Sequence, residues 1–194
     1  MERLIENIQK GSIYCIGSRP FIDKSQICIS IASSFAKNSE KVLYLSHTMN
    51  EDKFTEKLNN TYPEAYNNIY FEEVYKITIE RLGMFTSEDN YTLIILDPFD
   101  IYSLDLDVGD LKEFAKKKNV AILLTTNLAR PPLDSNRTHP VLSDIQFIDK
   151  KAQMKLIAFS DIIMFAYKKQ NDSQLYIRYE KNLYSSLPDE RVFE

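Results

Sequence analysis

The feature that most constrains this chain is the segment at residues 92–97, which reads Thr-Leu-Ile-Ile-Leu-Asp and is continuously apolar from Leu93 to Leu96. A strand of this kind, without polar alternation, is typical of a sheet that is buried on both faces. Pro98 follows directly and cannot continue a sheet ladder. Because such a strand needs a covering layer on each side, the run predicts an α/β domain.

The rest of the chain supports the same fold class. Further strands are predicted at 12–17, 42–46, 69–71 and 120–125, alternating with helices at 24–37, 50–60, 73–82 and 111–118. The stretch 127–142 contains Pro131, Pro132 and Pro140 and is expected to be a long loop. Two β runs, 161–167 and 174–180, are expected to extend the sheet in antiparallel fashion. We therefore expect one domain over residues 1–194, with a mainly parallel central sheet and helices on both faces.

Composition excludes several classes of protein. A formal net charge of −4 argues against an overall basic surface that grips nucleic acid. Two cysteines in apolar segments do not suggest a disulfide framework, which favours a reducing, cytoplasmic compartment. The longest apolar runs are too short to cross a bilayer, so no membrane partner is expected.

The first strand-to-helix turn, residues 17–25, reads Gly-Ser-Arg-Pro-Phe-Ile-Asp-Lys-Ser. It lies where a phosphate-binding Walker A loop would lie, beyond the carboxyl end of a strand, and Lys24-Ser25 match the pair that closes that motif. The lysine would contact the outer phosphates of ATP, and Ser25 with Asp97 would hold Mg²⁺. The candidate nucleotide-binding residues are Ser18, Arg19, Pro20, Asp23, Lys24, Ser25 and Asp97.

Asp23 departs from the motif, because a glycine normally precedes the lysine and leaves the backbone bare. Two like unit charges about 4 Å apart repel by roughly 4 kcal/mol at an effective dielectric of about 20. That repulsion would weaken the binding of a triphosphate by roughly three powers of ten. Taken alone, the loop is equally consistent with an ordinary strand-turn-helix that binds no nucleotide.

Several segments, in the right order, resemble the motor domain of DnaB-type replicative helicases, a RecA-like P-loop ATPase. The resemblance extends over roughly residues 8 to 185. It is carried by Gly-Ser-Ile-Tyr at 11–14, Arg-Pro at 19–20, Ser-His-Thr-Met at 46–49, the Walker B run 93–97, Leu-Lys-Glu-Phe-Ala at 111–115 with Asn-Val at 119–120, Thr-Thr-Asn-Leu-Ala-Arg at 125–130, Leu-Ser-Asp-Ile at 142–145, Ser-Asp-Ile-Ile-Met-Phe at 160–165 and Glu-Lys-Asn at 180–182.

The departures from that family concern catalysis. Thr48 stands where the resemblance implies a catalytic glutamate, and a hydroxyl cannot act as a carboxylate base. Asn127 replaces the sensor glutamine. Leu183 replaces the arginine finger expected after Lys181, and a leucine has no charged fork. The resemblance therefore implies a weakened ATP–Mg²⁺ site without hydrolysis.

The DNA-facing segments are also altered. Arg130, Arg137 and Gln146 are the candidate contacts to single-stranded DNA, which is expected to bind weakly at most, because residues 105, 107 and 110 are acidic. We expect no N-terminal helicase domain, and a hexamer formed by this chain alone is doubtful. The expected partner is a replicative helicase or another replication protein.

Three functions remain open at this point. The first is a degenerate, non-catalytic DnaB-like regulator of DNA replication. The second is an active ATP-dependent DNA helicase with unorthodox residues. The third is a protein-interaction module without nucleotide, in which Asp23 pairs with Lys24 or Arg19.

Overall fold

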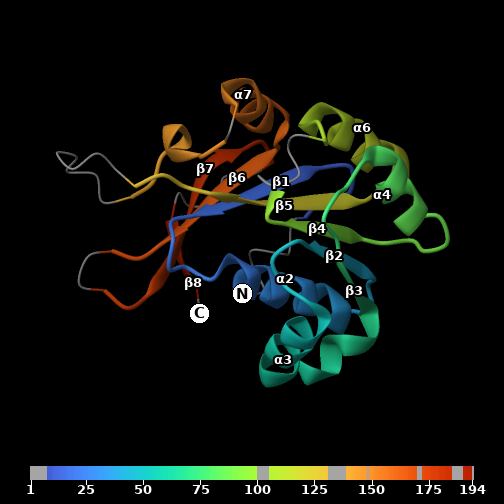
Figure 1. The fold of residues 1–194 in the computed structure, drawn as a ribbon. Helices are drawn as coiled ribbons and strands as arrows, with labels where there is room; N and C mark the ends of the chain where they lie inside the picture. Colours follow the sequence, from blue (N-terminus) through green and yellow to red (C-terminus); the bar gives the residue numbers. More distant parts are fainter. Residues whose placement is uncertain are drawn as a thin grey trace.

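A computed structural model describes residues 8–99, 105–130, 139–147, 149–169, 172–184 and 190–193, without the side chain of residue 66. The chain alternates strands and helices along its length (Figure 1). The strands are β1 (Ile13–Ser18), β2 (Val42–Ser46), β3 (Ile69–Glu73), β4 (Leu93–Asp97), β5 (Ala121–Asn127), β6 (Ile162–Tyr167), β7 (Leu175–Asn182) and β8 (Glu190–Phe193). The α-helices are α2 (Lys24–Lys37), α3 (Glu51–Thr61), α4 (Ile79–Phe85), α6 (Val108–Lys118) and α7 (Lys150–Phe159), and short 3₁₀ turns are η1 (Pro63–Asn68) and η2 (Leu142–Asp144).

These strands form one eight-stranded sheet in the order β3-β2-β4-β5-β1-β6-β7-β8. The pairs from β3 to β6 are parallel, whereas β7 and β8 are antiparallel. The predicted α/β class with a mainly parallel sheet is confirmed. The expectation that 161–167 is antiparallel is wrong, because the crossover helix α7 returns the chain and β6 starts at the same edge as β1.

Two boundaries differ from the sequence prediction. The helix expected at 73–82 begins only at Ile79, because Glu73 still belongs to β3 and the Thr78 side chain caps the helix through the Arg81 N–H. Helix α7 was not predicted. It buries only Leu156 fully, so its apolar periodicity is weak.

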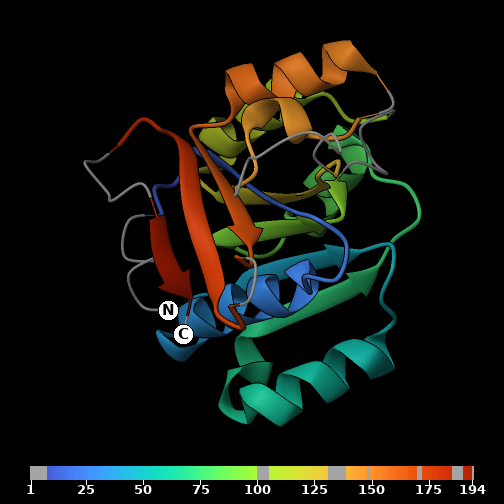
Figure 2. The same cartoon turned by 90° about the vertical axis from the view of Figure 1, so that its left-hand side faces the viewer.

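Helices cover both faces of the sheet (Figure 2). Alternating strand side chains divide the core into two layers, one on each face. In β1, Ile13 and Cys15 face the layer that contains α6 and α7, while Tyr14 and Ile16 face α2 and α3. The same alternation runs through β2, β4 and β5. Both faces are therefore covered, as the apolar run at β4 predicts.

Among the helices that the structure describes, none is both long enough and apolar enough to span a bilayer.

Gly17 is the tightest packing position among the described glycines. A Cβ there would lie 2.8 Å from Leu128 Cδ2 and 3.0 Å from the Phe165 ring, and both neighbours are buried. We expect Gly17→Ala to lower the free energy of unfolding by about 1–3 kcal/mol, because the core is overpacked. Urea denaturation measures this change.

The matched control is Gly83→Ala in α4, where a Cβ would meet no atom within 4 Å. It should leave stability unchanged or raise it by up to about 1 kcal/mol, because alanine favours the helix. Equal losses in the two variants would contradict this account of packing at Gly17.

Candidate functional site

The Asp97 carboxylate is the centre of the candidate site. It lies at the carboxyl end of β4 and is 2% exposed. Its Oδ2 accepts hydrogen bonds from the Ser25 hydroxyl at 2.6 Å and the Tyr44 hydroxyl at 2.7 Å, and its Oδ1 accepts one from Thr125 at 2.7 Å. Three hydroxyl groups thus satisfy one buried anion, which would otherwise be costly to remove from water.

The convergence of these groups follows from strand periodicity and register. Leu93 and Ile95 of β4 point to the α2 layer, so Asp97, two residues further, points there too. Tyr44 of β2 faces the same layer, and so does Thr125, which follows Leu123 by two residues. Because α2 packs on this face, its second residue, Ser25, reaches the carboxylate.

Lys24 occupies the space beside this cluster. Its Nζ donates a hydrogen bond to Asn127 Oδ1 at 2.9 Å and to Ser18 Oγ at 3.4 Å. Ser18 and Asn127 are register partners at the ends of β1 and β5. Five residues singled out from the sequence therefore lie at the carboxyl edge of the sheet in two adjacent hydrogen-bonded groups, Ser18, Lys24 and Asn127 in one and Ser25 and Asp97 in the other.

Within the part of the chain that the structure describes, the Asp23 side chain forms no hydrogen bond or ion pair with Lys24. It caps α2, where Oδ1 accepts the Gln26 N–H at 2.9 Å, and Oδ2 forms an ion pair with Lys57 of α3. Burial alone would raise the pKa of Asp23, but Lys57 and the helix N–H hold it below its usual range. The expectation that Asp23 pairs with Lys24 or Arg19 is wrong, because α3 brings a closer cation.

The loop between β1 and α2 also forms hydrogen bonds between its own backbone groups. The Lys24 N–H donates to the Ile22 carbonyl at 3.0 Å, and Ile22 N–H donates to the Arg19 carbonyl at 3.4 Å. Phe21 has φ 77° and is 95% exposed, and φ above zero is rare for a bulky side chain. Pro20 is exposed. The Arg19 guanidinium lies 3.5 Å from the Asp144 carboxylate.

The two residues at or beside the catalytic positions that the resemblance implies, Thr48 and Lys181, lie in different places. Thr48 is exposed just beyond β2, with its N–H on Ser46 Oγ at 3.3 Å, and Ser46 Oγ in turn donates to the Asp97 carbonyl. Lys181 is not part of this cluster. It pairs with Ile163 near the start of β6, and its Nζ donates to the carbonyls of residues 157 and 158 at the end of α7.

The candidate DNA contacts are only partly described. Arg130 and Gln146 are exposed, and Arg137 lies outside the described residues. The Gln146 N–H donates to the Asn127 carbonyl at 2.9 Å, and an antiparallel bridge joins Leu128 to Ile145. The segment that carries Gln146 is thus hydrogen-bonded to Asn127, whose side chain accepts the hydrogen bond from Lys24.

Three residues of the site were not predicted from the sequence. Tyr44 and Thr125 appear there as ordinary strand residues, although their polar atoms inside apolar runs were a usable signal. Lys57 belongs to a polar helix with many charges, so no sequence pattern distinguishes it.

The residues present fit a nucleotide only in part. Ser25 and Asp97 supply the hard oxygen atoms that Mg²⁺ prefers, and Lys24 supplies a cation for phosphate. The N-terminus of α2, which in a phosphate loop stays open to the ligand, instead binds the chain's own Asp23 carboxylate.

Comparison with solved structures identifies the fold as RecA-like. A DnaB-like replicative helicase, described with its interactions with primase, matches with TM-score 0.75 and 16% identity over 96% of this chain and 54% of its own. A second solved structure, described as an ATPase domain, matches with TM-score 0.76 and 15% identity, covering 95% of this chain and 80% of that one. The flagellar accessory protein FlaH from Methanocaldococcus jannaschii matches with TM-score 0.73 and 16% identity, covering 100% and 89%. At these identities the likeness establishes the fold alone.

Sequence comparison adds little. The DNA repair protein RadA of Helicobacter pylori is 46% identical over 39 residues, which is 20% of this chain and 9% of RadA, in each of two strains. No protein-family model matches the chain. The chain thus spans a small part of RadA and about half of the DnaB-like helicase.

The Asp97 cluster gives a stability prediction. Burial, and then the negative charge of Asp97, hold the pKa of Tyr44 well above its usual range, so its hydroxyl stays protonated and donates. We expect Tyr44→Phe to lower the free energy of unfolding by about 1.5–3 kcal/mol, because a buried carboxylate loses a donor. Tyr62→Phe, whose hydroxyl bonds the neutral Ser30 at 3.3 Å, should cost no more than about 1 kcal/mol. Chemical denaturation compares them, and losses of equal size would refute the role assigned to Tyr44.

Proposed function

We propose that this chain is a degenerate RecA-like ATPase domain that acts as a binding or regulatory protein in DNA replication and does not hydrolyse ATP. The observation that carries the proposal is the Asp23 carboxylate, which caps α2 at the position of the Walker A glycine. An anion that belongs to the chain already binds the N-terminus of the helix that would receive the phosphates of ATP.

Electrostatics supports weak rather than tight nucleotide binding. Lys57 neutralises much of the Asp23 charge, so the repulsion of a triphosphate is smaller than for an unpaired carboxylate. Even so, the N–H groups of Lys24 and Gln26 are bonded within the loop, and a ligand must displace those bonds. Lys24, Ser25 and Asp97 remain as contacts for a magnesium–nucleotide complex of low affinity.

The residue at the expected base position supports the absence of turnover. Thr48 is exposed at the position of the expected glutamate, and its hydroxyl cannot take a proton from water at neutral pH. Asn127, at the sensor position, binds Lys24 through its side chain. Both features favour a domain whose ATP-site residues serve structure.

The proposed partner is a replicative helicase or another replication protein. The support is the structural likeness to a DnaB-like helicase whose own description includes interactions with primase. Single-stranded DNA is a secondary ligand, for which exposed Arg130 and Gln146 are the described candidates.

An active ATPase is the second candidate, and a specific observation favours it. Ser25 Oγ and Asp97 Oδ2 lie 2.6 Å apart, so both oxygen atoms are available to one Mg²⁺ ion, and Asp23 has its counter-ion in Lys57. This candidate requires magnesium-dependent nucleotide binding and turnover that single-stranded DNA stimulates.

The test measures binding of a fluorescent ATP analogue with Mg²⁺, and phosphate release with and without single-stranded DNA. The unmodified chain should release no more phosphate than Lys24→Ala. Asp23→Gly should bind the analogue at least about tenfold more tightly, because the internal anion is gone, while glycine at the cap position costs only a few tenths of a kcal/mol.

Asp107→Gly is the matched control, because Asp107 also caps a helix, α6, and also pairs with a lysine, Lys155, but on the other face of the sheet. The part of its affinity for the analogue that depends on Lys24 should not change. Turnover by the unmodified chain that Lys24→Ala abolishes would establish the second candidate, and equal affinities of Asp23→Gly and the unmodified chain would refute the role of Asp23.

A further inference from the structure

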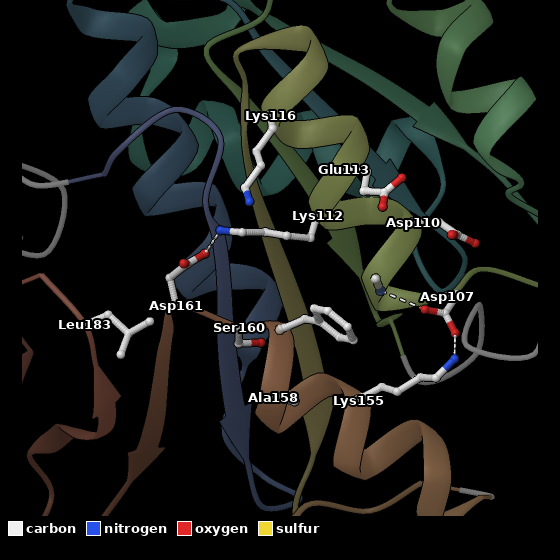
Figure 3. A pocket seen from close by; sticks show the side chains of 12 residues that line it. Asp107, Asp110, Lys112, Glu113, Lys116, Lys155, Ala158, Ser160, Asp161 and Leu183 are labelled. Atoms are coloured by element: carbon white, nitrogen blue, oxygen red, sulfur yellow. Dashed lines mark hydrogen bonds and ion pairs between the residues drawn. The ribbon is translucent and has the colours of Figure 1, made fainter.

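Two adjoining cavities open at the amino edge of the sheet, far along the strands from Lys24. The larger, about 510 Å³, lies between α6 and α7, and the smaller, about 420 Å³, lies beside the turn before β1. They share Lys112, Lys116 and Asp161 in their walls. Figure 3 shows the ammonium groups of Lys112 and Lys116 turned to the same side of α6, toward Asp161.

The smaller cavity has an excess of positive charge. Lys10, Lys112 and Lys116 line it, against the single carboxylate of Asp161. That carboxylate is already satisfied by an ion pair with Lys112 and by the Ile13 N–H at 2.7 Å. Burial would raise the pKa of Asp161, but these contacts lower it, so it stays ionised and offers little to further cations. Lys10 and Lys116 have no carboxylate partner among the residues that the structure describes.

Hydrogen-bonding groups surround these cations. Ser12 Oγ and Tyr184 Oη lie 2.9 Å apart, and both residues line the smaller cavity together with Asn119. Gly11, with φ 79° and its N–H on the Val120 carbonyl, holds the turn against the end of α6. In the larger cavity the buried Ser160 hydroxyl has no hydrogen-bond partner in the described part of the chain.

The larger cavity limits the size and charge of a ligand. Asp107, Asp110 and Glu113 line one side of it and would repel a polyanion such as nucleic acid. Phe159 and Leu183 are 42% and 62% exposed there and offer apolar surface. The walls therefore suit a compact ligand with one anionic group and an apolar body, and the volumes are those of small-molecule sites.

The geometry points to a binding site for a small phosphate monoester, with its phosphate among Lys10, Lys112 and Lys116 and its organic part against Phe159 and Leu183. Lysine ammonium groups bind phosphate as point charges, and a dianion gains from several of them at once. This site is independent of Lys24 and of the proposed loss of ATP hydrolysis.

The test is a nuclear magnetic resonance titration of the labelled full chain with phenyl phosphate, inorganic phosphate and benzoate, each against sodium chloride of equal ionic strength. Phenyl phosphate should cause saturable shifts in the amides of Gly11, Ser12, Lys116 and Tyr184. It should bind more tightly than inorganic phosphate, because of the apolar wall, and more tightly than benzoate, because of its second charge.

Lys10→Ala and Lys116→Ala should each weaken the binding of phenyl phosphate by about fivefold or more. Lys117→Ala removes the same charge from the neighbouring position of α6, outside both cavities, and should not change the affinity. Shifts no larger than those in sodium chloride, equal losses in Lys116→Ala and Lys117→Ala, or equal affinity for benzoate would overturn the proposal.

Discussion

The buried carboxylate of Asp97 is the group on which the arrangement of the candidate site depends. A charge at 2% exposure must be satisfied where it lies, and hydroxyl groups from α2, β2 and β5 meet it. These bonds fix the start of α2 relative to three central strands. Because Ser25 is held in this way, its neighbour Lys24 is directed to the ends of β1 and β5.

Asp23 shows that the effect of a residue in a binding loop depends on its partners in the fold. As a sequence change it places a negative charge where phosphate would bind. In the fold the same carboxylate caps α2 and pairs with Lys57 from the next helix. The loop is thereby stabilised without a ligand, and this is the observation on which our proposal of a binding or regulatory role rests.

The two edges of the sheet present different chemistry. At the carboxyl edge the cation Lys24 is engaged with Asn127 and Ser18, so a ligand must compete with internal bonds. At the amino edge Lys10 and Lys116 face a cavity beside a carboxylate that Lys112 already satisfies. An anion therefore competes with fewer internal bonds at the amino edge, although ligands of open α/β sheets generally bind at the carboxyl edge.

The sequence by itself determined the α/β class, the covered sheet and most strand positions, because apolar runs and helical spacing are local signals. It also identified Ser18, Lys24, Ser25, Asp97 and Asn127, since each lies at a strand end or helix start. Only the tertiary structure decided the parallel direction of β6, the partner of Asp23 and the position of Lys181 away from the site. Those outcomes depend on which helix packs beside which strand, and pairs such as Asp23 and Lys57, 34 residues apart, leave no periodic trace along the chain.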